Sequence, residues 1–247
     1  MTQLPMNRDL IVKPTAEEVV QTAAELFVGV SHESIAARNR FSVALAGGST
    51  PRALYQLLAS AQWQGHIDWS KTHIFFGDER AVPPDDEQSN YRMARESLLA
   101  HIPIAPAHIH RLHGEEANLE AAAQDYERQL RELQAPLDLV LLGMGDDGHT
   151  SSLFPHTPAL QEQERWCVAT DVAPHEPHVR RLTLTYPVLN AAHNIFIIVT
   201  GASKAERLRD VLEGASHPLD TPIQGIQPQQ GRLVWMLDAA AARLLSH

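Results

Sequence analysis

The chain has 247 residues, of which 44% are hydrophobic and 20% are charged. This ordinary globular composition argues against collagen-like repeats, a coiled coil and a disordered chain. The formal net charge of −10 argues against non-specific nucleic-acid binding, so we expect no nucleic-acid partner. A single cysteine, Cys167, excludes a disulfide framework and a cysteine-rich zinc site, and we expect it to be a small buried residue.

Neither a membrane span nor a secretory signal is visible in the sequence. The most apolar run, residues 195–199, is far shorter than the roughly 20 residues that a transmembrane helix needs. Residues 1–8 lack the apolar core of a secretory signal. We therefore expect a cytoplasmic protein with no membrane partner, and a monomer or weak homodimer. Because no repeat or strong linker is found, residues 1–247 are predicted to form a single domain.

Strands and helices are predicted to alternate along the chain. Thr15 and Glu18 have the spacing of a capping box, and Pro51 suits the first position of a helix after a glycine turn. In chain order we expect a helix over 16–37, a strand over 41–46, a helix over 51–60, a strand over 72–76, helices over 90–101 and 118–134, a strand over 137–142, extended segments over 166–171 and 180–185, a strand over 194–200, a helix over 202–213, a loop of undetermined role over 216–231, a strand over 232–237 and a helix from 238. This alternation predicts an α/β fold with an open, mostly parallel sheet, Rossmann-like, and helices on both faces.

The chemically unusual residues follow four of these strands, in segments 47–50, 77–80, 143–149 and 201–204. The carboxyl ends of parallel strands share one edge of the sheet, where ligands bind. We therefore expect the following side chains to gather in one place: Ser49, Thr50, Asp78, Arg80, Asp147, His149 and Lys204.

The first of these segments, Gly47-Gly48-Ser49-Thr50, resembles an anion cradle. Glycines let the backbone approach a ligand, hydroxyls donate, and the following helix offers free N–H groups and the positive end of its dipole. The alternative is an ordinary turn with a serine or threonine cap.

Cations that could hold an anion lie farther along the chain. Arg80 offers a planar fork to phosphate or carboxylate, and Lys204 offers a point charge. The alternatives are a surface salt bridge of Arg80 with Glu79 or Asp78 and a solvated lysine. Arg181, at the start of a strand, has weaker support.

His149 is the candidate general base, because an imidazole is largely neutral at pH 7 and still accepts a proton. Asp147 could fix its tautomer or balance its charge. The alternative is a structural histidine that caps the following helix.

Two other enzyme patterns are present but incomplete. Residues 143–148 match the dinucleotide-binding pattern G-x-G-x-x-G, yet two acids in the loop would repel a pyrophosphate. Ser49, Asp78 and His149 follow the chain order of an α/β-hydrolase triad, but the turn lacks the second glycine of G-x-S-x-G.

His108, His110 and His113 suggest a metal site at first sight. The loop supplies no matched carboxylate spacing, and the first two would point in opposite directions from a strand. A surface loop is the preferred interpretation, and no metal is expected.

Taken together, the motifs resemble the 6-phosphogluconolactonase family and extend from about residue 40 to 213. They are, in order, residues 46–51, 77–80, 89–91, 143–155, 181–185 and 200–204. The related glucosamine-6-phosphate isomerases share the fold and the glycine turn, but they have Asp-Glu-Tyr where this chain has Asp78-Glu79-Arg80. They also carry a ring-opening glutamate where this chain has Phe154.

The resemblance implies a glucosamine-6-phosphate isomerase-like fold and metal-independent hydrolysis of 6-phospho-D-glucono-1,5-lactone, in the oxidative pentose phosphate pathway, without a cofactor. The partner implied is a small sugar phosphate lactone. A glucosamine-6-phosphate deaminase/isomerase and a sugar-phosphate-binding module without turnover are the alternatives. The candidate catalytic residues are His149, Asp147 and Arg80, and the candidate substrate-binding residues are Gly47, Gly48, Ser49, Thr50, Asp78, Arg80, Arg181 and Lys204.

Overall fold

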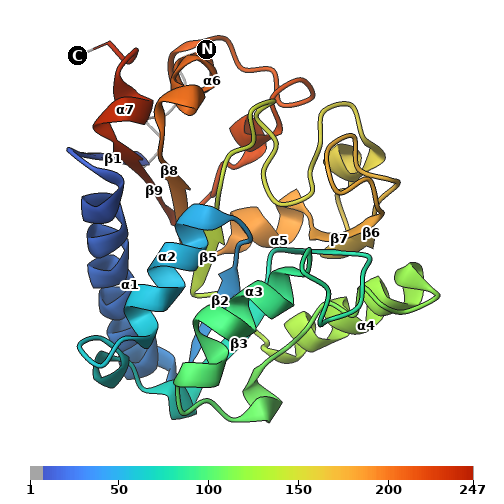
Figure 1. The fold of residues 1–247 in the computed structure, drawn as a ribbon. Helices are drawn as coiled ribbons and strands as arrows, with labels where there is room; N and C mark the ends of the chain where they lie inside the picture. The colour runs from blue at the N-terminus through green and yellow to red at the C-terminus, as the bar shows by residue number, and fades with distance from the viewer. Residues whose placement is uncertain (1–7, 247) are drawn as a thin grey trace.

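A computed structural model describes residues 8–246 of the chain (Figure 1). Residues 1–7, which make up most of the N-terminal segment without the apolar core of a secretory signal, lie outside the described residues. Within the described range, no helix combines the length and the apolar character that crossing a bilayer demands.

Two sheets organise the described residues. The larger is parallel and has six strands, in the spatial order β1 (Arg8–Lys13), β9 (Arg232–Asp238), β8 (Asn194–Val199), β5 (Leu139–Leu142), β2 (Phe41–Leu45) and β3 (Thr72–Phe76). The smaller is antiparallel and has three, in the order β4 (Asp78–Arg80), β7 (Arg181–Leu184) and β6 (Cys167–Ala169).

The α-helices among residues 8–246 are α1 (Ala16–Arg38), α2 (Ser49–Ala59), α3 (Asn90–Ser97), α4 (Leu119–Glu132), α5 (Tyr186–Ala191), α6 (Ala205–Glu213) and α7 (Ala239–Ala242). The α/β class and the mostly parallel sheet are therefore confirmed. Every residue of β2 and of β5 is buried. Since successive side chains of a strand point to opposite faces, both faces of the sheet are covered at its centre.

Local sequence signals account for the first helix. The Thr15 side chain accepts a hydrogen bond from the backbone N–H of Glu18 at 3.2 Å, as the capping pattern predicted. Asn39 ends α1 with a φ of 54°, a left-handed conformation that asparagine tolerates. Figure 1 shows α1 and α2 packed side by side at one side of the sheet.

The sequence predictions missed three details. The edge strand β1 was not expected, and two of its apolar residues, Leu10 and Val12, are exposed rather than buried. Segment 78–80 is a short strand of the second sheet, paired with β7, rather than a loop. Pro51 occupies the third helical position, not the first, because α2 already begins at Ser49.

The sheet has a topological switch point between β2 and β5, where the direction of the connections between strands reverses. From β2 the chain crosses to β3 on one side, whereas from β5 it crosses to β8 and β9 on the other. In open α/β sheets, ligands bind where this direction of crossing reverses, outside the carboxyl ends of the strands. The glycine turn after β2 and the loop after β5 flank this point.

Residues 216–231, whose role the sequence left open, support the second of these loops. The backbone N–H of Ile223 donates to the carbonyl of Gly148 at 2.9 Å, and Ile223 itself is buried. The hydroxyl of Tyr186 donates to the carbonyl of Pro222 at 2.6 Å. The segment therefore packs against the loop that carries Asp147 and His149.

Candidate active site

A cleft of about 310 Å³ lies at the carboxyl ends of β2, β5 and β8. Six of the side chains expected to gather there lie on its wall: Ser49, Thr50, Asp78, Arg80, His149 and Lys204. The seventh, Asp147, does not line the wall but contacts His149. The lining also includes Gly47, Gly48, Asn90, Met144 and Thr150. Most of the candidate residues therefore lie together, as expected from the shared edge at which parallel strands end.

The glycine turn after β2 leads into α2, whose first residues line the cleft. The N-cap residue is Gly48, which has a φ of 104° and no side chain with which to cap the helix. The first N–H groups of a helix have no partner within it, so they are available to an anion. Position 47 requires glycine because the Asn90 side chain packs against its backbone, and a Cβ there would lie 2.2 Å from Oδ1 of Asn90. These features favour the cradle over an ordinary capped turn.

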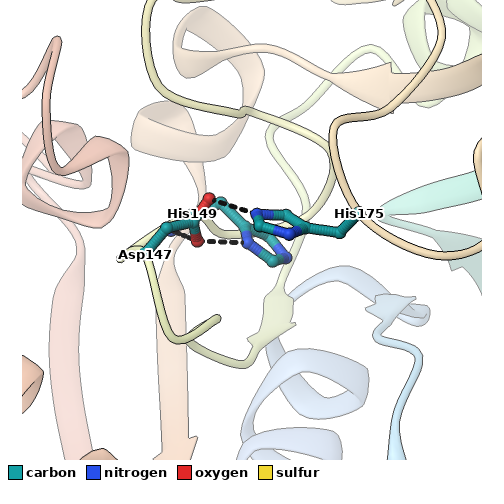
Figure 2. Close-up of side chains that lie close together, drawn as sticks. All are labelled: Asp147, His149 and His175. Atoms are coloured by element: carbon teal, nitrogen blue, oxygen red, sulfur yellow. Dashed lines mark hydrogen bonds and ion pairs between the residues drawn. The ribbon is translucent and has the colours of Figure 1, made fainter.

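Asp147 and His149 form a hydrogen-bonded pair in the loop after β5. Nδ1 of His149 lies 2.6 Å from Oδ1 of Asp147, which also accepts the backbone N–H of His149 at 3.0 Å. Nε2 of a second histidine, His175, lies 2.8 Å from Oδ2 of the same carboxylate (Figure 2). Burial alone would raise the pKa of the Asp147 carboxyl, but the hydrogen bonds from the two histidines hold it well below its usual range.

The loop backbone fits closely around the imidazole of His149. The N–H of Gly145 donates to the carbonyl of His149 at 2.9 Å. A Cβ at Gly145 would lie 2.1 Å from Nδ1 of His149, so only glycine leaves room for the ring in this place. The ring of Phe154 lies 4.7 Å from the His149 ring, between centroids. The imidazole is therefore held on several sides.

Arg80 lies on the cleft wall at the end of β4. Its Nη1 atom donates to the backbone carbonyl of Gln88. Its backbone N–H donates at 2.7 Å to Glu79, a buried carboxylate whose pKa is raised by burial despite this hydrogen bond and others. Among the ion pairs of the described residues, none joins the Arg80 guanidinium to Glu79 or Asp78.

Asp78 lies on the wall with both carboxylate oxygens engaged by the protein. Its Oδ2 accepts the hydroxyl of Ser152 at 2.6 Å, and its Oδ1 accepts the side-chain amide of Asn90 at 3.1 Å. The acid that contacts the His149 ring is Asp147 and not Asp78. The hydrolase-type triad of Ser49, Asp78 and His149 therefore does not form.

Lys204 ends a short 3-10 helix before α6 and reaches back to the loop after β5. Its Nζ lies 2.6 Å from Oδ1 of Asp146, a carboxylate whose side chain is 82% exposed. The ammonium is therefore paired at the edge of the cleft, and it is not a freely solvated lysine.

Arg181 is not among the residues that line the cleft, and its expected contact with a substrate stays a prediction. Its side chain is buried, and the residue pairs with Arg80 across the β4–β7 ladder. Its Nη2 donates to the backbone carbonyl of Pro177 at 2.8 Å. Burial, and then the neighbouring Arg80, lower its pKa. Its Nη2 is thus directed at the loop before β7, whereas its Nη1 is buried without a hydrogen-bond partner among the described residues.

Segment 108–113 is not the surface loop that the sequence predicted. His108 and His110 are half-buried, and both rings stack on His73, at centroid distances of 4.3 and 5.4 Å. They share one side because His108 ends a 3-10 turn and does not lie in a strand. Cys167 is buried, as expected.

One group among residues 8–246 has ligand atoms close enough to hold a metal ion: Asp147, His149 and His175, all within 4.8 Å of one another. The facing atoms of this group already form hydrogen bonds with one another. Sequence reasoning missed His175 because it follows no glycine turn and lies in an irregular segment before β7. Only a rich local content of proline and histidine marks that segment.

Comparisons with known proteins identify relatives of this chain. The profile of the family described as glucosamine-6-phosphate isomerases/6-phosphogluconolactonase matches residues 14–235. A 6-phosphogluconolactonase of Nostoc sp. is 39% identical over 248 residues, covering 98% of this chain and 100% of that protein. One of Mycobacterium tuberculosis is 38% identical, covering 97% of this chain and 99% of its own. The solved structure of the 6-phosphogluconolactonase from Trypanosoma cruzi superposes with a TM-score of 0.87 at 28% identity, and the match covers 100% of both chains.

Proposed function

The chain belongs to the glucosamine-6-phosphate isomerase/6-phosphogluconolactonase family, and on this premise we propose that it hydrolyses 6-phospho-D-glucono-1,5-lactone to 6-phospho-D-gluconate. The reaction is a step of the oxidative pentose phosphate pathway. The observation that carries the proposal is the position of the Asp147–His149 pair beside a cleft that also holds Arg80 and Lys204. A base and an anion-binding wall are the two things that hydrolysis of a phosphorylated lactone requires.

His149 is the general base of the proposed mechanism. With Nδ1 held by Asp147, its other ring nitrogen takes a proton from a water molecule as the water oxygen bonds to C1 of the lactone. The resulting oxyanion collapses, the bond between C1 and the ring oxygen breaks, and the imidazolium returns its proton to that oxygen. The product carboxylic acid then ionises and releases one proton to solvent.

The cations and the glycine turn hold the negative charges in this proposal. Arg80, Lys204 and the first residues of α2 line the same cleft. Binding the remote phosphate there would fix C1 relative to the base, so that binding energy is converted into orientation. Asp78 acts indirectly, since its oxygens hold Ser152 and Asn90.

The proposed reaction uses no metal. Both oxygens of Asp147 and the histidine nitrogens that face them are engaged in hydrogen bonds, and these bonds keep His149 oriented. We accordingly expect full activity after exhaustive treatment with EDTA. Loss of activity on chelation, with recovery on adding a divalent metal, would overturn this part of the proposal.

We also propose that the enzyme is cytoplasmic and acts as a single-domain monomer or weak homodimer. A buried hydrophobic cluster that includes residues from Val19 to Ala241 supports one domain. Analytical ultracentrifugation across a range of concentrations tests the oligomeric state, and a stable larger assembly would contradict it.

The deciding experiment follows proton release from freshly prepared phosphogluconolactone, beside ammonia release from glucosamine 6-phosphate. We expect acidification well above the spontaneous rate, and no ammonia. The ring of Phe154 beside His149 supports this outcome, because the isomerase relatives carry their ring-opening acid at that place in the sequence. Ammonia release would favour a deaminase, and binding without turnover of either compound would favour a sugar-phosphate sensor.

A further inference from the structure

We propose that His175 is a positioning residue, which holds the Asp147 carboxylate in the orientation that His149 needs. This inference rests on the proposed lactone hydrolysis and adds a residue to it. Nε2 of His175 lies 2.8 Å from Oδ2 of Asp147, and its ring stacks on that of His149 with centroids 5.7 Å apart (Figure 2). His175 does not line the cleft, whereas His149 does, so the two histidines have different roles.

Each oxygen of the Asp147 carboxylate forms hydrogen bonds with a different histidine. Oδ1 accepts from the backbone and ring of His149, and Oδ2 accepts from His175. A carboxylate with a partner on one oxygen can still rotate about its side-chain bonds. With both oxygens engaged, from different segments of the chain, its plane is fixed.

The tautomer of His149 follows from this arrangement. An ionised carboxylate only accepts hydrogen bonds, so Nδ1 of His149 must carry a hydrogen, and its Nε2 keeps the lone pair that takes the proton from water. His175 likewise donates from Nε2. Loss of the His175 contact frees Asp147 to turn, and the preference of His149 for this tautomer weakens.

Arg181 helps position His175 next to Asp147. His175 lies in the irregular segment 170–180 between β6 and β7. The buried guanidinium of Arg181 donates to the carbonyl of Pro177 at 2.8 Å, and the N–H of Ala173 donates to the carbonyl of Val179 at 3.0 Å. The arginine expected to bind substrate thus anchors the segment that carries the second histidine.

Three variants test the role of His175 in turnover. His175→Ala should lower kcat about tenfold and leave KM within about twofold, since the lost contact orients the base and does not bind substrate. His175→Gln keeps a side-chain N–H donor and should recover most of the loss. Glu176→Gln is the matched control, because its side chain is 83% exposed, and it should behave as wild type.

A spectroscopic measurement separates positioning from a merely structural effect. The 15N shifts of the His149 ring should report hydrogen on Nδ1 in the wild type and in His175→Gln, and a mixture of tautomers in His175→Ala. Unchanged kcat and an unchanged tautomer in His175→Ala would overturn the inference. Absence of lactone turnover in the wild type would instead overturn the proposed function, while the tautomer measurement still decides the role of His175.

Discussion

The ammonium of Lys204 lies 2.6 Å from the carboxylate of Asp146, so this cation on the wall of the cleft is already partly neutralised. The two partners differ in exposure, since the side chain of Lys204 is 23% exposed and that of Asp146 is 82% exposed. An anionic substrate that approaches Lys204 must therefore compete with a carboxylate that water also solvates.

Replacing Asp146 by Asn removes the competing charge and should lower KM by about two- to fivefold, the range that an exposed ion pair of up to about 1 kcal/mol allows. Lys204→Ala should raise KM, with a smaller effect on kcat. Steady-state kinetics at low and high salt measure both. An Asp146→Asn enzyme with a higher KM would show that Asp146 supports binding and does not compete with it.

His149→Ala should reduce kcat by about 10²–10⁴-fold, because the enzyme loses the group that takes the proton from water. The ring is only partly buried, so we expect the variant to stay folded. Initial rates of proton release, corrected for spontaneous hydrolysis, measure the loss, and circular dichroism checks the fold. A folded variant that retains near wild-type kcat would remove His149 from the mechanism.

Gly145→Ala should inactivate the enzyme nearly as strongly, although it removes no chemical group. The added Cβ would lie 2.1 Å from Nδ1 of His149, so the ring must leave its position against Asp147. The control is Gly29→Ala in α1, where nothing lies within 4 Å of the added Cβ. That change should leave activity intact and raise stability by up to about 1 kcal/mol. Equal activity of the two variants would contradict this close fit of the loop around the ring.

Asp147→Asn should lower kcat about tenfold or more at every pH of the assay, because an amide cannot accept from both histidines as the carboxylate does. Burial opposes ionisation of Asp147, but the hydrogen bonds from His149 and His175 win and lower its pKa. The wild-type carboxylate therefore stays ionised until the pH falls far below the assay range. A pH–rate profile of both enzymes tests this, and a defect confined to acidic pH would argue against it.

The sequence predicted the central site because its signals are local. Glycine turns after buried strands could be recognised without coordinates, and sheet geometry then placed Arg80, His149 and Lys204 together. His175 and Arg181 could not be placed, since their positions depend on how the segment before β7 folds back. A contact between residues 147 and 175 leaves no periodic trace in either segment.

The stacked histidines outside the cleft should make the protein sensitive to acid. Burial lowers the pKa of His73 to about 4, and the nearby charges of protonated His108 and His110 and of Arg40 act in the same direction. The folded state therefore favours the neutral ring. The contribution of the neutral His73 ring to the free energy of unfolding is fully present above the ordinary histidine pKa of about 6.5, and it is lost as the pH falls toward 4.

The expected result is a free energy of unfolding that declines between pH 6.5 and 4, and that declines less in His73→Gln, which has no ring to protonate. Urea denaturation at a series of pH values measures the slope, whose size is moderated because His73 is only partly buried. The control is His101→Gln, at an exposed histidine, which should keep the wild-type slope. Identical slopes for wild type and His73→Gln would show that the acid sensitivity arises elsewhere in the protein.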